Sequence, residues 1–553
     1  MFAGRNNGRP RRCIFYILAF LFSQFLFILI FLRSESFDNV PFRQQIKHDN
    51  DSWDHYLDWR EFISYTSERS AKFYLYNLNL SNTLGVIRKL PSTRHYSCGY
   101  RPRKLPPPSK ANVSVVISFH NEARSMLLRT IVSLLARTPE DHLHELILVD
   151  DGSQDVTLLN DLRRWMGGVF GARHRLGLQF LANRERMGLI WSRNRGASLA
   201  SGHYVLFLDS HCEVNEGWLE PLLERLALNP QLAVSPVLDP IDPLTLAYRK
   251  GNELLKGGFD WSLHFHWLRR QLAEKELPEM PFKSPAFAGG ILMMSREWFL
   301  KLGGFNSYLK IWGGESIELA TKLWLCGGQI EIVPCSRIGH IFRRRHAFDF
   351  PPQSDAQETY LHNSKIIAES WLDKYKNMFY ALRPAARRIP LDHTADEMQQ
   401  LSRQLQCQPF EWYLRHVSPE LRMQFEELAA TGSLRNGDRC LHARQKDAQL
   451  ILASCHLGDV TQWSMLRSSG QLSTQRELCL GVASTKRITL EPCGRNETTR
   501  TTQRWLRLST HLLHAGTLLC LDNPLTDRLE LSVCRPHAPS QSFQFALEME
   551  THT

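Results

Sequence analysis

Residues Asp209-Ser210-His211 place a carboxylate and an imidazole two positions apart, directly after the apolar run Tyr204–Leu208. If that run is a strand, alternate residues at its end point to the same side, so both side chains can bind one ion. Oxygen and imidazole ligands suit Mn²⁺, an ion that also accepts diphosphate oxygens. His340, in the stretch Gly339–Arg343, is the candidate third ligand. The structural alternative is that Asp209 caps a helix beside a surface histidine.

The elements that would position these residues have the pattern of an α/β domain, from about residue 111 to 345. Apolar runs predict buried strands at Val113–Phe119, Glu145–Val149 and Tyr204–Leu208. Apolar residues at helical spacing predict a helix after the first strand, at Met126, Leu127, Ile131, Leu134 and Leu135. Polar residues follow the carboxyl ends of these strands, where open α/β sheets bind ligands. Neither GxGxxG after the first strand nor GxxxxGK[ST] occurs, which disfavours dinucleotide and P-loop enzymes.

Beyond about residue 430 the pattern changes to short apolar pieces in three copies of about 40 residues. Each copy begins with Cys-Leu and ends with an aromatic residue, namely Trp463, Trp505 or Phe543. The spacing of the cysteines predicts three local disulfides, Cys440–Cys455, Cys479–Cys493 and Cys520–Cys534. The CxxC knuckles that zinc favours are absent, so disulfides in an oxidising compartment are favoured over zinc. The repeat predicts a pseudo-threefold β domain.

The N-terminus predicts a membrane anchor. Residues 13–32 are almost unbroken apolar, and about 30 Å of helix from 20 residues matches a bilayer core. Four arginines and no acidic residue precede this segment, which predicts a cytosolic tail (1–12) and a lumenal body. The alternative, a cleaved signal peptide, requires a shorter apolar region and a small-residue cleavage site. Residues 33–95 lack clear periodicity and are predicted to form a stem.

Composition indicates a large globular protein with no marked preference for nucleic acid. The chain has 553 residues, 43% of them hydrophobic, so it exceeds one typical domain and can build a packed core. The formal net charge of +11 is mild for this length and is not gathered in long basic runs. We therefore expect no nucleic-acid partner.

Motifs spread from about Tyr96 to the C-terminus resemble those of the polypeptide N-acetylgalactosaminyltransferases, Golgi enzymes that begin mucin-type O-glycosylation. The motifs occur in the family's order, at Phe119–Thr130, Val149–Ser153, Leu208–Glu213, Gly217–Leu222, Gly257–Trp261, Ala288–Gly290, Ile311–Glu315 and Gly339–Arg343. The resemblance implies a Rossmann-like GT-A catalytic domain at 96–400, a linker at 401–427 and a ricin-type β-trefoil lectin at 428–548. It also implies a single-pass type II Golgi membrane protein.

The resemblance implies that UDP-GalNAc is the donor, Mn²⁺ the cofactor, and Ser/Thr-containing polypeptides or glycopeptides the acceptors. Asp209, His211 and His340 match the family's metal ligands. The positions that match the family's donor-binding residues are Ser118, Asp151, Arg186, Ser210, Trp312, Arg343, His346 and Phe348. A diphosphate leaving group develops negative charge, which Mn²⁺ and Arg343 can neutralise in a site from which the Trp312 loop excludes water.

The family retains the anomeric configuration, and Glu315 is the candidate catalytic carboxylate. Glu315 and Glu318 could form the carboxylate pair of a double displacement. Alternatively, both are acidic residues at a helix N-terminus. The account usual for the family is a same-face attack in which the departing phosphate takes the acceptor's proton and Glu315 orients the acceptor or the sugar. The resemblance further implies the disulfides Cys98–Cys335 and Cys326–Cys407, which leaves Cys13 and Cys212 free.

Some positions depart from the family pattern. Ser316 replaces an Asn and Phe348 replaces a Tyr, and each change removes a hydrogen-bonding group near the donor. These departures keep two alternatives open, a related transferase with another donor or acceptor and a catalytically silent, lectin-like binding protein. In the β domain only the third repeat keeps the Cys-Leu-Asp triplet. We therefore expect GalNAc binding in that lobe alone, through Asp522 and the neighbouring Asn523.

Overall fold

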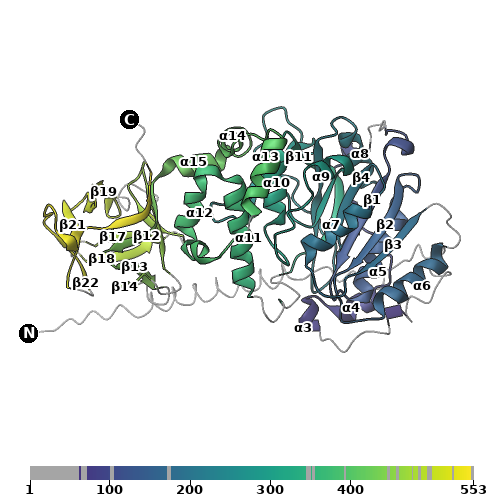
Figure 1. The fold of residues 1–553 in the computed structure, drawn as a ribbon, viewed down its shortest axis with the longest axis horizontal. Helices are drawn as coiled ribbons and strands as arrows, with labels where there is room; N and C mark the ends of the chain where they lie inside the picture. Colours follow the sequence, from purple (N-terminus) through teal and green to yellow (C-terminus); the bar gives the residue numbers. More distant parts are fainter. Residues whose placement is uncertain are drawn as a thin grey trace, which may run out of the picture.

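The structure is a computed structural model. It describes residues 62–63, 71–99, 105–170, 176–343, 350, 355–391, 394–444, 449–455, 460–475, 478–483, 487–494, 501–525 and 528–549. The predicted tail (1–12) and membrane anchor (13–32) lie outside these residues. Within the described ranges, no helix combines the length and the apolar character that spanning a membrane would require. Figure 1 shows an α/β domain at one end, an all-β domain at the other, and a group of helices between them.

The α/β domain is built on a nine-stranded sheet of order β3-β2-β1-β4-β10-β6-β11-β5, with β9 paired to β11. Its strands are β1 (Val113–Phe119), β2 (Leu143–Asp150), β3 (Gly177–Ala182), β4 (Tyr204–Asp209), β5 (Cys212–Val214), β6 (Leu232–Ile241), β9 (Phe282–Lys283), β10 (Ile291–Ser295) and β11 (Gln329–Ile341). Strand β1 runs parallel to both β2 and β4. The carboxyl ends of these three strands therefore meet at one edge, and the three strands predicted from sequence are confirmed.

Helices cover both faces of this sheet. They are α5 (Arg124–Arg137), α6 (Leu158–Phe170), α7 (Leu189–Leu199), α8 (Glu220–Leu226), α9 (Arg296–Lys301) and α10 (Glu315–Leu325). Val115 and Ile117 of β1 pack with α5, α6 and α8, whereas Val116 packs with α7, α9 and α10. Successive residues of β1 face opposite helical layers, and both layers exclude solvent. The strand is therefore a continuous apolar run.

The segment before β1 belongs to the α/β domain and not to a free stem. It contains α3 (Ala71–Tyr74), α4 (Leu78–Thr83), η1 (Tyr96–Gly99) and η2 (Pro108–Lys110). The Asn77 side chain caps α4, and its backbone N–H donates to Pro243 O at 2.8 Å. Arg88 pairs with the buried Glu213 at 2.6 Å. The described part of the predicted stem therefore packs on the α/β domain, so the folded unit begins well before Tyr96.

The helices between the two ends also differ from the predicted linker at 401–427. They are α11 (Ala356–Trp371), η3 (Asp373–Tyr375), α12 (Lys376–Leu382), η4 (Pro384–Arg388), α13 (Thr394–Gln404), α14 (Phe410–His416) and α15 (Pro419–Glu427). Phe410 and Tyr413 are fully buried in the core that also contains α7, α9 and α10. The Tyr413 hydroxyl donates to Pro285 O at 3.0 Å. Residues 401–427 therefore pack into the core of the α/β domain, and the predicted boundary at 400 has no counterpart in the fold.

The all-β domain has the predicted threefold repeat. Its strands are β12 (Leu428–Asn436), β13 (Arg439–Arg444), β14 (Gln449–Ser454), β15 (Gln462–Leu466), β16 (Leu472–Thr474), β17 (Leu478–Val482), β18 (Ile488–Pro492), β19 (Trp505–Leu508), β20 (His511–His514), β21 (Leu519–Leu525), β22 (Arg528–Ser532) and β23 (Gln544–Glu548), with η5 (Pro539–Gln541) before β23. Trp463, Trp505 and Phe543 are fully buried at its centre. The Trp463 indole donates to Leu441 O at 2.9 Å, and the Trp505 indole donates to Leu480 O at 2.8 Å. Equivalent residues thus make equivalent contacts in two of the repeats.

All five predicted disulfides are present. They are Cys98–Cys335, Cys326–Cys407, Cys440–Cys455, Cys479–Cys493 and Cys520–Cys534. Cys212 is a buried free thiol, as expected, and Cys13 lies outside the described residues. Cys326–Cys407 joins the end of α10 to the segment after α13, which ties the intervening helices to the sheet.

Candidate active site and metal centre

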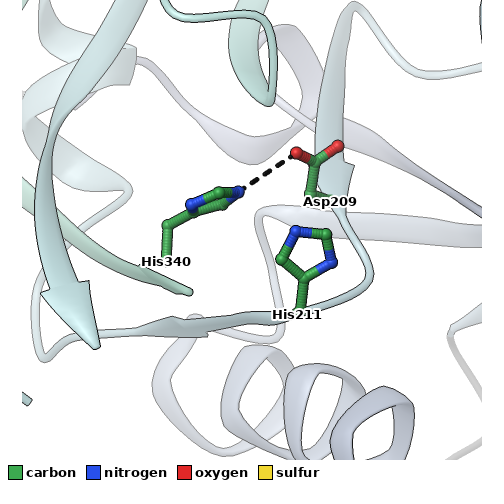
Figure 2. A group of neighbouring side chains, drawn as sticks. All are labelled: Asp209, His211 and His340. Atoms are coloured by element: carbon green, nitrogen blue, oxygen red, sulfur yellow. Dashed lines mark hydrogen bonds and ion pairs between the residues drawn. The ribbon is translucent and has the colours of Figure 1, made fainter. Parts of the chain in front are cut away.

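Asp209, His211 and His340 converge at the carboxyl edge of the sheet, as Figure 2 shows. One ligand atom from each lies within 4.8 Å of the others. The expected strand geometry is incomplete, because β4 ends at Asp209 and His211 lies in the turn before β5. His340 arrives from β11, which pairs antiparallel with β5 and places His340 opposite Cys212. The hydrogen bond between His340 Nε2 and Asp209 Oδ2 is 3.3 Å long.

The chain leaves room for an ion beside this cluster. Gly290 lies against it, and a Cβ at this residue would fall far inside van der Waals contact of Asp209 Oδ2 and 3.6 Å from His340 Nε2. One carboxylate and two imidazoles are a donor set that suits Mn²⁺. The residues present therefore fit the expected cofactor in both chemistry and space.

The charge states of the ligands favour metal binding. Burial alone would raise the pKa of Asp209, but the hydrogen bond from His340 and the charge of Arg193 outweigh it, so the pKa lies below its ordinary value. Burial, helped by the charge of Arg343, lowers the pKa of His211 despite its bond to Glu122. An ionised carboxylate beside a neutral imidazole is the state in which these residues coordinate metals.

Glu122 is a buried carboxylate whose role the sequence argument missed. It follows β1, and its two oxygens accept hydrogen bonds from the side chains of Tyr76, Ser210 and Arg343, at 2.9 to 3.1 Å. His211 Nδ1 lies 3.0 Å from Glu122 Oε2, so its N–H can donate there and leave Nε2 for a metal. Burial would raise the pKa of Glu122, but Arg343 and His211 hold it below its ordinary value. Glu122 thus orients one metal ligand and one candidate phosphate-binding arginine together.

Glu315 and Asp209 are joined through a second residue that the sequence argument missed, Arg193 of α7. Arg193 Nη2 donates to Asp209 Oδ1 at 2.8 Å, and Nη1 lies 3.7 Å from Glu315 Oε1. Glu315 is the first residue of α10, and burial raises its pKa against the charge of Arg193. Glu318 lies elsewhere, fully buried 3.2 Å from Lys322 and bonded to the Trp371 indole. Glu318 is therefore a structural carboxylate, which removes the partner that a carboxylate-pair mechanism would need.

The candidate nucleotide residues surround the other side of the same cavity. Asp151 follows β2, and its carboxylate accepts from Asn183 Nδ2 and from the backbone N–H groups of Met187 and Gly188, at 2.8 to 2.9 Å. These bonds fix the loop that carries Arg186, which lines the cavity. The Ser118 hydroxyl, at the end of β1, is buried without a hydrogen-bond partner among the described residues. An unpartnered buried hydroxyl at a cavity wall is costly unless a ligand pairs with it.

Two of the remaining predicted residues line the cavity, and two lie outside the described residues. Trp312 lines the cavity in a loop held by Asn363 of α11, whose Nδ2 donates to the carbonyls of Lys310, Trp312 and Gly313. Ser210 also lines the cavity, and its hydroxyl donates to Glu122 at 3.0 Å. His346 and Phe348 lie outside the described residues.

These residues line one cavity of about 780 Å³, large enough for a nucleotide sugar. One wall is the hairpin of β7 (Leu255–Phe259) and β8 (Phe265–Arg269), and it carries Phe265 and Trp267. Their rings meet edge to face at 5.2 Å, and Trp267 is 39% exposed. This pair was not predicted from sequence, although two aromatic residues spaced two apart on a short strand indicate that both rings lie on one face.

In the β domain, Asp522 lies on β21 and is almost fully buried. Its Oδ2 accepts from Ser532, and from Arg535 and Gln541 at 2.9 Å each. Its Oδ1 and the Asn523 Oδ1 have no hydrogen-bond partner among the described residues. Asn523 Nδ2 donates to Asn436 at 3.2 Å. The third lobe therefore holds two adjacent oxygens with spare acceptor capacity, both enclosed by the protein in this structure.

Comparisons with known proteins agree with this architecture. Residues 114–303 match the family described as Glycosyl transferase family 2, residues 269–347 the N-terminal domain of galactosyltransferase, and residues 430–543 the Ricin-type beta-trefoil lectin domain. A crystal structure of GalNAc-T7 with UDP, GalNAc and Mn²⁺ superposes with a TM-score of 0.67 at 27% identity, over 88% of this chain and 90% of that one.

Two relatives match along most or all of their length. A putative polypeptide N-acetylgalactosaminyltransferase 13 of Drosophila melanogaster is 76% identical over 559 aligned residues, covering all of both chains. The human polypeptide N-acetylgalactosaminyltransferase 14 is 38% identical over 499 residues, 86% of each chain. The chain belongs to the polypeptide N-acetylgalactosaminyltransferase family, with a GT-A catalytic domain and a ricin-type β-trefoil lectin.

Proposed function

We propose that this protein transfers GalNAc from UDP-GalNAc to Ser or Thr hydroxyls of polypeptides and so initiates mucin-type O-glycosylation. The observation that carries the proposal is the intact metal cluster of Asp209, His211 and His340, with Gly290 leaving space beside it in a nucleotide-sized cavity. A silent family member would have no need to keep these three residues converged. Ser316 also lines the cavity, so the missing Asn changes one contact and leaves the cluster intact.

Asp209, His211 and His340 would hold Mn²⁺, which supplies positive charge to a diphosphate leaving group. Arg343 is placed to add a second positive charge, because Glu122 fixes its guanidinium at 2.9 Å. Ser118, Asp151 and Arg186 line the part of the cavity that would hold the uridine and ribose. Trp312, in the loop held by Asn363, would exclude water that could otherwise hydrolyse the donor.

Transfer would proceed with retention through attack on the face from which UDP leaves. The acceptor oxygen bonds to the anomeric carbon, the bond from that carbon to the β-phosphate oxygen breaks, and the hydroxyl proton passes to the departing phosphate. Glu315 would orient the acceptor or the sugar, because Arg193 and the backbone N–H of Gly313 hold its carboxylate. The position of Glu318 away from the cavity supports this account over a double displacement.

The test of this function uses the lumenal part of the chain with UDP-GalNAc, Mn²⁺ and single-site Thr peptides. A mass gain of one HexNAc, absent from the Asp209→Ala variant, is the expected result. Nucleotide binding without transfer would overturn the proposed activity and favour a silent binding protein. NMR of the linkage formed early in the reaction would report an α-glycoside, and a β-glycoside would contradict retention.

The acceptor is expected to lie on the exposed Trp267 ring at the mouth of the cavity. Replacing Trp267 with alanine should raise the KM for peptide about tenfold, because aromatic anchors of this kind contribute about 1–2 kcal/mol. The KM for UDP-GalNAc should stay the same. Trp191→Ala is the matched control, since Trp191 is equally exposed on α7 but does not line the cavity. Equal peptide KM values in the two variants would rule out this docking position.

The lectin site is expected to act on substrates that already carry GalNAc. Asp522→Ala should abolish any preference for GalNAc-bearing over naked peptides and leave naked-peptide turnover unchanged, because the sugar hydroxyls lose their fixed acceptor. Since Asp522 also anchors Ser532, Arg535 and Gln541, Asp522→Asn serves as a milder second variant. Asp438→Ala, in an exposed turn of the first repeat, is the control. An unaltered glycopeptide preference in both Asp522 variants would show that this lobe does not bind GalNAc.

We also propose that the protein is a single-pass type II Golgi membrane protein with its catalytic part in the lumen. The apolar segment 13–32 behind four arginines supports this topology. The five disulfides suit an oxidising compartment. Protection of the C-terminus from protease in sealed microsomes, with cleavage of an N-terminal tag, would test the orientation.

A further inference from the structure

A second cavity, of about 1080 Å³, lies between the catalytic core and the lectin. One wall comes from α11, α12 and η4, and the other comes from the first two lectin repeats and β23. In Figure 1, α12 lies on the side of the middle group of helices that faces the β domain. None of the residues assigned above to the donor, the metal or the lectin sugar site lines this cleft.

The cleft is strongly cationic. Five arginines line it, three from the catalytic wall and two from the lectin wall, namely Arg383, Arg387, Arg388, Arg435 and Arg444. No aspartate or glutamate is among the described residues that line it. An arginine keeps its charge at every physiological pH, so the cleft holds a permanent excess of positive charge.

Four of these five arginines have no carboxylate partner among the residues that the structure describes. Within the described ranges, no ion pair joins Arg383, Arg387, Arg388 or Arg435 to an acidic side chain. By contrast, the arginines on the nearby helices α14 and α15 are paired, Arg415 with Glu411 and Arg422 with Glu426, each at 2.8 Å. The Arg387 guanidinium instead lies 4.6 Å above the Tyr380 ring, which holds it in place without neutralising it.

A buried histidine adds a polar group that lacks a partner. His442 stands in the first repeat where the third has Asp522, and it lines the cleft while only 8% exposed. Its Nε2 has no hydrogen-bond partner among the described residues. His442 therefore adds a buried, unsatisfied polar atom to the lectin wall of the cleft.

The cleft and the catalytic cavity share a wall at one residue. Tyr360 of α11 lines both cavities. The His264 ring, in the catalytic cavity, stacks on Tyr360 at 5.3 Å, and Arg383 Nη2 contacts His264 at 2.8 Å. A polypeptide whose Ser or Thr occupies the catalytic cavity and whose chain passes Tyr360 therefore meets Arg383 first and the other arginines beyond it.

We propose that the cleft binds an acidic segment of the acceptor polypeptide, so that the enzyme prefers substrates with glutamates or aspartates at a distance from the glycosylated residue. The proposal rests on the proposed transferase function and names its substrate class. Guanidinium groups bind carboxylates bidentately, which makes arginine better suited than lysine to this recognition. Because the cleft is open to solvent, the preference should weaken as salt screens it.

The experiment measures transfer by the lumenal protein to peptides that carry one Thr, a neutral spacer of graded length and a terminal block of either Glu or Gln. The block is placed at either end of the peptide. At one of the two ends, and within one range of spacer lengths, the Glu peptide should have a KM about tenfold lower than the Gln peptide at low salt, because several partly exposed ion pairs add up. This advantage should disappear at high salt. In the Arg387→Gln/Arg388→Gln variant, the Glu-to-Gln ratio of kcat/KM should fall from about ten to about one.

The matched control is Arg415→Gln/Arg422→Gln, which removes the same charge from outside the cleft and should keep the full ratio. Equal rates for Glu and Gln peptides in the parent protein would overturn the cleft proposal while leaving the transferase function standing. A preference that persists in Arg387→Gln/Arg388→Gln would also overturn it, because the charge would then be recognised elsewhere. Failure to modify any peptide would count against the transferase function itself.

Discussion

Gly290→Ala is expected to abolish Mn²⁺-dependent transfer, with a loss of about 10³-fold or more in kcat/KM, because a metal contributes several kcal/mol to a charged leaving group. The new methyl group would occupy space against Asp209 Oδ2 and close to His340 Nε2, where an ion would sit. Gly290 has no positive φ, so the methyl adds volume without requiring a strained backbone. Mn²⁺ titration of the purified variant should show the loss directly.

The control for this substitution is Gly167→Ala on α6. Gly167 has open space around its Cβ position, so the change should leave metal binding intact and slightly stabilise the helix. Asp209→Asn is a second variant that removes a ligand charge at constant volume. Normal metal affinity in folded Gly290→Ala protein would place the ion elsewhere and contradict the site.

Glu122→Gln is expected to weaken Mn²⁺ binding 10–100-fold and to lower kcat as well, as is typical when the partner of a metal-ligating histidine is changed. The neutral amide keeps one acceptor oxygen and places an NH₂ group where the other stood, so it cannot accept from both His211 and Arg343 as the carboxylate does, and the guanidinium loses its counter-charge. Glu122 does not coordinate the metal in this account. It acts through His211 and Arg343, so it is a positioning residue.

A matched change in a second buried carboxylate separates this effect from a general loss of stability. Glu213→Gln also removes a charge paired with an arginine, here Arg88 at 2.6 Å, but Glu213 does not line the cavity. It should lower the melting temperature with little change in Mn²⁺ affinity. If both variants lose stability equally and both keep normal metal affinity, Glu122 has no positioning role.

The features predicted from sequence were those encoded within short segments. The strand at Val113–Phe119 matches β1 residue for residue, because its burial on both faces requires a continuous apolar run. The lectin disulfides follow from local spacing, since each closes a loop of 14 or 15 residues. His340 was a candidate third ligand by residue type, and the family motifs supported it, because local spacing does not link residues that are 131 apart in the chain.

The features that sequence could not supply arise from contacts between distant segments. Glu122 acquires its role from Arg343, which lies 221 residues away, and Arg193 acquires its role by reaching both Asp209 and Glu315. Charged side chains are rarely buried, and the sequence does not show which of them are, because burial depends on partners from distant segments. Contacts between distant segments also explain why the predicted stem and linker boundaries differ from the fold. Residues 71–94 and 401–427 lack a strong periodic pattern of their own, and they fold by packing on the α/β domain.

The central claim is that a metal-dependent sugar transfer occurs at the cluster of Asp209, His211 and His340. The most direct test incubates the lumenal protein with UDP-GalNAc and a Thr peptide, with Mn²⁺ or with a chelator, and measures the peptide mass. We predict a gain of one HexNAc that requires Mn²⁺, is restored when the metal is returned, and is absent in Asp209→Asn. Equal transfer in the chelator, or in Asp209→Asn, would contradict the account.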